Sequence, residues 1–115
     1  MSVREFYTRF DSVFFEKTRL SMMTILYQEE AASYNHFKKV IGGTDGAIYS
    51  HIRKLLEAGY VTGQKEIADN SAQTVYTMTE SGKRLFTEYL QFLEKLLTEK
   101  KKNARRKNID AKGRG

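Results

Sequence analysis

One segment, bounded by glycines at Gly43 and Gly59, carries its large aliphatic residues on a single side of a helix. They are spaced i, i+4, i+7 and i+8 and are Ile48, Ile52, Leu55 and Leu56. This spacing is that of one face of an amphipathic helix, for which Thr44 is a typical N-cap and Gly59 a typical C-terminal stop. The chain must therefore bury one side of a helix over about residues 44–58 and leave its other side to water or to a partner.

The segments around this helix predict a small, mainly helical domain. Aromatic residues at helical spacings predict a helix near residues 2–15, apolar residues a packed helix at 17–28, and a short stripe a helix at 34–41. Residues 29–33 are interpreted as a polar connection. Beyond Gly59, two alternating runs about the ADNSA turn predict a hairpin over about 61–78, and a last helix is expected over about 79–98. The expected fold is mainly α with a small β-hairpin: a winged helix-turn-helix with extra N- and C-terminal helices.

Composition excludes several function classes. The chain has no Cys and only two His, His36 and His51, so we expect no disulfide, no metal site and no cofactor. No apolar run reaches the roughly 20 residues of a membrane span, and the N-terminus lacks a signal-peptide pattern, so we expect a cytoplasmic protein without a membrane partner. The glycines lack the Lys-Ser/Thr ending of a phosphate-binding loop, and no catalytic arrangement emerges, so an enzyme is not expected.

The positive charge of the chain is concentrated at its C-terminal end. Residues 100–115 hold eight of the 20 basic residues and one of the 14 acidic ones, which leaves residues 1–99 with a net charge of −1. We expect residues 1–99 to form the domain and residues 100–115 to form a disordered basic tail. The tail is either a solvated terminus or an arm that adds sequence-independent affinity for nucleic acid.

The polar side of the 44–58 helix has residues that suit a DNA major groove. Small residues at its N-terminal end permit close approach, and Tyr49, Ser50 and Arg53 offer groups that bond base edges or phosphates. A solvated helix face has a similar composition. The position of the helix, after a short helix and a glycine turn and before a hairpin, favours DNA recognition.

Three segments resemble the winged-helix transcription regulators of the MarR, ArsR and PadR kind: FDSVFFEKTRLSMMTIL, SYNHFKKVIGGTDGAIYSHIRKLLEAGYV and TVYTMTESGKRLFTEYL. The resemblance covers about residues 10–97. It implies a homodimer on double-stranded operator DNA, with the third helix in the major groove and the wing at the backbone. The DNA-facing residues are then Thr44, Gly46, Ala47, Tyr49, Ser50, Arg53 and Lys54 on that helix and Lys65, Asn70, Ser71, Gln73 and Thr74 on the wing. Independently of the resemblance, Lys38 on the preceding helix is either part of its solvated side or a contact to a flanking phosphate.

The wing tip departs from the family pattern. Many relatives carry Arg or Lys there, whereas this chain has Asp69 within Ala68–Ala72. Repulsion between this carboxylate and phosphate disfavours deep insertion into the minor groove. Lys65 is then the best remaining cation of the wing.

The last helix has two adjacent apolar stripes, and a domain this small is expected to cover only one of them. We expect a homodimer in which the first and last helices mix across a two-fold axis. The expected interface residues are Phe6, Tyr7, Phe10, Phe14, Leu85, Tyr89, Phe92, Leu93 and Leu96. In the alternative, the N-terminal segment folds over its own last helix and leaves a monomer.

Two other functions remain open at this point. The same helix would serve as a docking face in a winged-helix module that binds protein and not DNA. A repressor that responds to a small molecule near the aromatic cluster would extend the DNA-binding function, although nothing in the sequence shows a pocket for such an effector.

Overall fold

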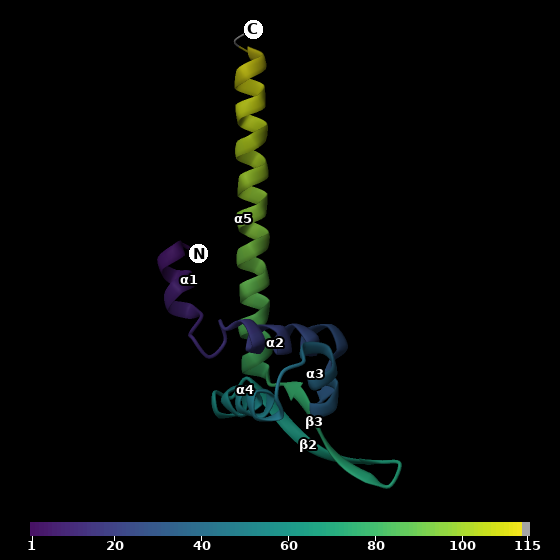
Figure 1. Cartoon of the computed structure of the whole chain (residues 1–115). Helices are drawn as coiled ribbons and strands as arrows, with labels where there is room; N and C mark the ends of the chain where they lie inside the picture. The colour runs from purple at the N-terminus through teal and green to yellow at the C-terminus, as the bar shows by residue number, and fades with distance from the viewer. Residues whose placement is uncertain (114–115) are drawn as a thin grey trace.

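A computed structural model describes the backbone of residues 1–113 and the side chains of residues 1–67 and 69–105. A long C-terminal helix rises from a small body, and a hairpin projects from that body at the opposite end (Figure 1). In chain order the elements are α1 (Val3–Arg9), α2 (Lys17–Glu29), β1 (Ala31–Ser33), α3 (Tyr34–Ile41), α4 (Asp45–Glu57), β2 (Val61–Ala68), β3 (Ser71–Met78) and α5 (Glu80–Gly113). This order confirms the expected winged helix-turn-helix with additional terminal helices.

Helices α2, α3 and α4 pack around one apolar core. Phe37 of α3, Ile48, Ile52 and Leu55 of α4, and Met22 and Met23 of α2 are nearly or completely buried in it. The Thr44 side chain accepts a hydrogen bond from the amide of Ala47, which confirms the predicted N-cap, and Gly59 has the positive φ of a helix stop. Leu56 was expected in the core but is 39% exposed, because it lies at the edge of the buried stripe.

The sheet has three antiparallel strands in the order β1-β3-β2. β2 and β3 form the predicted hairpin, and Ala68 pairs with Ser71 across Asp69 and Asn70. These two turn residues both have positive φ, as in the two-residue turns that match strand twist. The interpretation of residues 29–33 as a connection was wrong for Ala31–Ser33, which form β1 because they pair with distant residues 75–77 of β3.

The N-terminal helix is shorter than predicted. α1 ends at Arg9, because Phe10 adopts an extended conformation and the side chain of Asp11 then accepts from the amide of Phe14 in a turn. Phe10 and Phe14, expected at a subunit interface, are instead buried in the core of their own chain. α1 itself lies on α5 of the same chain, where the rings of Phe6 and Phe92 stack at 4.4 Å.

Helix α5 is longer than predicted and continues through Gly113, where a disordered tail was expected. The physical reason lies in composition: between Gly82 and Gly113 the chain has no Gly or Pro, and Leu, Glu, Lys and Arg are good helix formers. Within the part of the chain that the structure describes, no helix is both long enough and apolar enough to cross a membrane.

The first turn of α5 is locked under the end of α4. Thr79 donates from its hydroxyl to the carbonyl of Gly59 and from its amide to the carbonyl of Tyr60. The Thr79 hydroxyl also accepts from the amide of Gly82, so Thr79 caps α5. A Cβ atom on Gly82 would lie 2.0 Å from the Tyr60 carbonyl oxygen, so only glycine fits at this crossing.

Replacing Gly82 with alanine should therefore destabilise the fold. The added methyl meets backbone atoms that cannot yield without moving the start of β2, and we expect a loss of about 1–3 kcal/mol in the free energy of unfolding by urea denaturation. Gly46→Ala is the matched control, since a Cβ there meets nothing within 4 Å. Equal stability of the two variants would contradict the close crossing.

Candidate nucleic-acid interface

The polar side of α4 is open to solvent. All seven residues predicted to face DNA from this helix and its cap are exposed, namely Thr44, Gly46, Ala47, Tyr49, Ser50, Arg53 and Lys54. Tyr49 is 56% exposed although it is aromatic. Arg53 and Lys54 form no ion pair with side chains of residues 1–67 or 69–105. The helix thus offers two uncommitted cations beside small and hydroxyl-bearing side chains.

The N-terminal end of α4 has a polar clamp that the sequence did not reveal. The Tyr34 hydroxyl donates to the Asp45 carboxylate at 2.7 Å, and the ammonium of Lys38 pairs with the same oxygen. The hydrogen bonds from Lys38 and Tyr34 lower the pKa of Asp45, while the bond to Asp45 raises the pKa of Tyr34 to about 12. Lys38, predicted at a DNA phosphate, is therefore engaged with Asp45, and it offsets the one negative charge at this end of the helix.

On its inner side, α4 is anchored through His51 to a buried arginine. Arg19 is 7% exposed, and its guanidinium donates to the carbonyls of Ser12 and Val13 and to Nδ1 of His51 at 2.7 Å. An arginine can only donate, so Nδ1 of His51 is the acceptor of this hydrogen bond. The Glu16 carboxylate lies 3.5 Å from the same nitrogen. Arg19 thus links His51 on α4 to the segment before α2.

The wing presents its predicted residues on two different faces. Side chains alternate along a strand, and Lys65 pairs directly with Thr74. Gln73 and Ser71 lie on the opposite face, and Asn70 lies in the turn at the tip. Lys65, Asn70, Ser71 and Gln73 are exposed and Thr74 is partly buried. The hairpin brings Lys65 and Thr74 together but separates them from Gln73 and Ser71.

One exposed apolar side chain on the wing was not predicted. Ile67 is 83% exposed, on the same face as Lys65 and close to the tip. Alternation along β2 places Ile67 on the same face as buried Val61, but it does not show that the hairpin extends past the core at this point.

The residues expected at a dimer interface divide into covered and exposed sets. Leu85 joins Phe10 and Phe14 in the core, so its assignment to an interface was wrong; a helix with two apolar stripes does not reveal which of them faces inward. Phe6, Tyr89 and Phe92 are partly buried within the chain. Tyr7, Leu93 and Leu96 remain exposed, and Leu97 beside them is 57% exposed.

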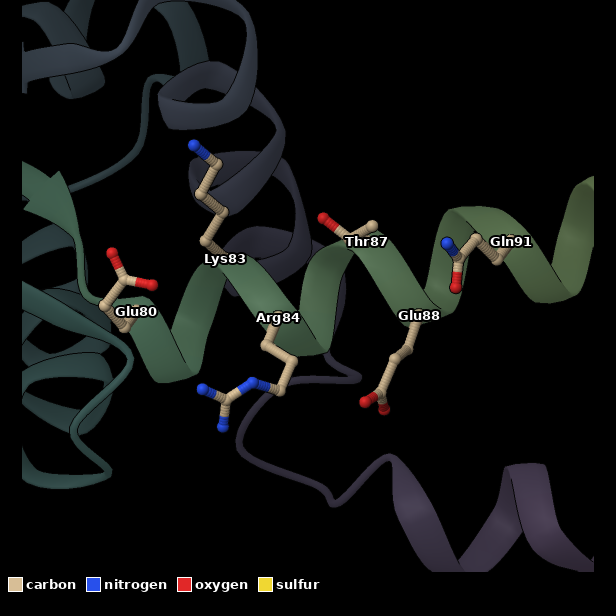
Figure 2. Close-up of a pocket in the computed structure, with 6 residues that line it drawn as sticks. All are labelled: Glu80, Lys83, Arg84, Thr87, Glu88 and Gln91. Atoms are coloured by element: carbon tan, nitrogen blue, oxygen red, sulfur yellow. The ribbon is translucent and has the colours of Figure 1, made fainter.

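A depression along the first three turns of α5 does not resemble a catalytic site. It has a volume of about 350 Å³ and is lined by Glu80, Lys83, Arg84, Thr87, Glu88 and Gln91. Figure 2 shows these side chains leaving the helix in different directions without converging on a common centre. Among the described residues, no group of three His, Cys, Asp or Glu side chains lies close enough to hold a metal ion.

The fold and this exposed helix agree with a comparison against known protein families. Residues 18–97 match the family model of the winged helix DNA-binding domain. The chain belongs to this family. The matched span begins at α2 and ends within α5, so it contains the whole helix-turn-helix and the wing.

Two similar proteins align with most of this chain. An uncharacterized protein of Methanocaldococcus jannaschii is 28% identical over 78 residues, which cover 68% of this chain and 85% of that protein. The structure of a transcriptional regulator homologue from Pyrococcus horikoshii OT3 is 29% identical, with a TM-score of 0.64, over 82% of this chain and 98% of that one.

Two further structures share the fold at lower identity. A protein of Enterococcus faecalis V583, assigned to the MarR family of transcriptional regulators, is 20% identical with a TM-score of 0.72 over 91% of this chain and 94% of that one. Bacillus subtilis PadR, solved in complex with operator DNA, is 19% identical with a TM-score of 0.57 over 65% of this chain and 47% of that one. Both structures thus share the winged-helix fold with this chain.

The free energy of unfolding should depend on pH through Glu16, which lies beside His51 of α4. Burial raises the pKa of Glu16, but hydrogen bonds from the amides of Arg19 and Thr18 outweigh it and bring the pKa below 4.5. A carboxyl with a lowered pKa stabilises the fold above its unfolded pKa, and this contribution is lost as pH falls through the folded pKa. Glu16→Gln should therefore lower the free energy of unfolding by roughly 0.5–1 kcal/mol near neutral pH, the scale of one N-cap bond.

Denaturation of both proteins across pH checks this expectation. The difference between them should shrink as pH falls well below 4.5, where Glu16 is protonated in the unfolded chain. Glu94→Gln, at an exposed position on α5, serves as the control and should show no such trend. A difference for Glu16→Gln that stays constant over the whole range would contradict the charged cap.

Proposed function

We propose that this chain is a transcription regulator that binds operator DNA as a homodimer, with α4 in the major groove and the wing at the backbone. The observation that carries the proposal is the exposed polar side of α4, held on a buried aliphatic stripe within a winged helix-turn-helix. Operator DNA is bound by PadR, whose structure shares this fold. A selection of duplexes from a random pool tests the proposal directly, and the expected product is a site with two-fold symmetry.

Along α4, different residue types make different contacts with DNA. Gly46 and Ala47 let the N-terminal end approach base edges, and Ser50 and Tyr49 supply hydroxyls for hydrogen bonds there. Arg53 lies one turn further and reaches guanine or a phosphate, while Lys54 contacts the backbone. Lys38 acts at the flank, where its pairing with Asp45 keeps a carboxylate from repelling phosphate.

On the wing, Lys65 and Thr74 form the contact face. They share one side of the hairpin, and Lys65 is the basic residue of β2. Asn70 at the tip, with Ser71 and Gln73 on the other side, offers hydrogen bonds to sugar and phosphate oxygens. Because Asp69 occupies the tip, the wing stays at the backbone and does not enter the minor groove.

The second subunit covers the exposed leucines of α5. Leu93, Leu96 and Leu97 form an exposed stripe on α5, and Leu96 lies beside the residues that begin the chain, Met1–Val3. Tyr7 on α1 is 82% exposed. Pairing of these surfaces across a two-fold axis removes apolar area from water. Two α4 helices about 34 Å apart would then meet successive major grooves.

Arg53→Ala tests the contact of α4 with DNA. We expect specific binding of the selected duplex to weaken by about 1–3 kcal/mol without loss of fold, since Arg53 is exposed and unpaired within the described chain. Fluorescence anisotropy titrations at several salt concentrations measure the change. Arg84→Ala, an exposed arginine on α5, is the matched control and should leave affinity unchanged; equal effects of the two variants would reject α4 as the reading helix.

The double variant Leu93→Glu and Leu96→Glu tests the dimer. Charges placed on the apolar stripe should convert the dimer to a monomer in sedimentation velocity, because a carboxylate buried in an apolar interface without a partner is costly. Gln91→Glu adds a charge on the polar side of the same helix (Figure 2) and should leave the mass unchanged. A double variant that sediments like the unaltered chain would reject this interface.

A further inference from the structure

We propose that the basic end of α5 is a second nucleic-acid-binding surface, and that it holds a different duplex segment from the one that α4 reads. The inference rests on the proposed function, since it assumes that α4 occupies an operator. It assigns to the protein a further activity, the bridging of two DNA segments.

The basic end of α5 is charged and open. Lys100, Lys101, Lys102 and Arg105 are all exposed, and none of them pairs with an acidic side chain of residues 1–67 or 69–105. The printed sequence adds four further basic residues by position 114 against the single acid Asp110. The residues before position 100 carry a net charge of −1, so this end of the helix holds the excess positive charge of the chain.

The basic end of α5, called the arm from here on, lies far from α4. The molecule measures 73 × 28 × 25 Å, and Figure 1 shows α4 and the hairpin at one end of its long axis and the end of α5 at the other. At 1.5 Å per residue, Lys100 lies about 30 Å along the helix from Glu80. This separation exceeds the Debye length of about 8 Å at physiological salt several times over. A duplex seated on α4 therefore gains almost nothing from these charges.

This geometry separates the basic segment from a duplex on α4. A flexible tail could fold back towards that duplex. A continuous helix cannot fold back, so its cations must find a polyanion elsewhere.

The composition of the arm favours a phosphate backbone over a protein or membrane partner. Between Thr98 and Asn108 the only apolar residue is Ala104. Protein interfaces depend on buried aromatic or aliphatic side chains, and a helix that binds a membrane surface needs an apolar face. This stretch has neither feature. Release of counterions from a duplex needs only closely spaced cations, which this stretch supplies.

A two-step capture experiment tests the inference. The selected operator duplex is fixed to beads and saturated with the full-length protein, and a fluorescent duplex of unrelated sequence is then added. We expect the beads to retain this second duplex, less so as salt rises. In the variant K100Q/K101Q/K102Q/R105Q, retention should fall about tenfold or more, while affinity for the single operator duplex changes less than about twofold.

The matched control removes four exposed charges elsewhere, K17Q/K83Q/R84Q/K95Q, and should retain the second duplex. Protein that never binds the fixed operator would refute the proposed function and this inference with it. Operator binding with no second duplex, or with retention that the arm variant leaves intact, would overturn the inference alone. The inference would also be overturned if the arm variant lost affinity for the operator duplex by the same factor as it lost retention of the second duplex. In that case the arm and α4 would contact the same duplex.

Discussion

The contact of Ile48, Ile52 and Leu55 with the core fixes the rotation of α4 about its own axis. Ile48 and Ile52 are 1% and 2% exposed, and burial of each such side chain contributes about 1.5–3 kcal/mol. A turn of about 100°, one residue along the helix, would bring Tyr49 and Arg53 into the same space. That exchange would bury a guanidinium without a partner. The aliphatic stripe therefore determines which side chains of α4 remain outside, and every proposed contact of α4 with DNA depends on it.

Hydrogen bonds and close packing join α4 to the start of α5, the helix that carries the proposed subunit contact. Arg19 ties the segment before α2 to His51 of α4, and Thr79 and Gly82 tie the first turn of α5 to the residues that follow α4. A displacement of α5 must therefore carry α4 with it. In the proposed dimer, the spacing of the two α4 helices is set by how the α5 helices pair, and a change at that contact would alter the fit to successive grooves.

Local patterns made much of the fold predictable, and long-range packing made the rest unpredictable. The stripe and caps of α4 are encoded within residues 44–59, and the two strands of the hairpin within residues 61–78. β1 has no such signal, since Ala31–Ser33 become a strand only through pairing with β3 more than forty residues away. Leu85 and Leu93 both belong to the apolar stripes of the last helix. Which of them contacts the core depends on where α5 crosses Tyr60, and this crossing lies at Gly82. The exposed side of α4 was predictable, whereas the clamp of Tyr34 on Asp45 joins two helices and was not.

The contacts of Tyr34 and Lys38 with Asp45 also affect how a domain with almost no net charge would attract DNA. Lys38 is committed to Asp45, so the N-terminal half of α4 presents hydrogen-bonding groups with little net charge, and Arg53 and Lys54 provide positive charge further along. Contacts from the first half would then discriminate bases, since hydrogen bonds to base edges depend on sequence, while the second half supplies salt-dependent attraction that does not. The remaining excess charge lies on α5, far from this surface. Residues 1–99 have almost no net charge, and the excess cations lie at the far end of α5. This distribution of charge suits sequence-dependent binding of one duplex by α4 and nonspecific binding of a second duplex by α5. It is less suited to tight nonspecific binding of a single duplex.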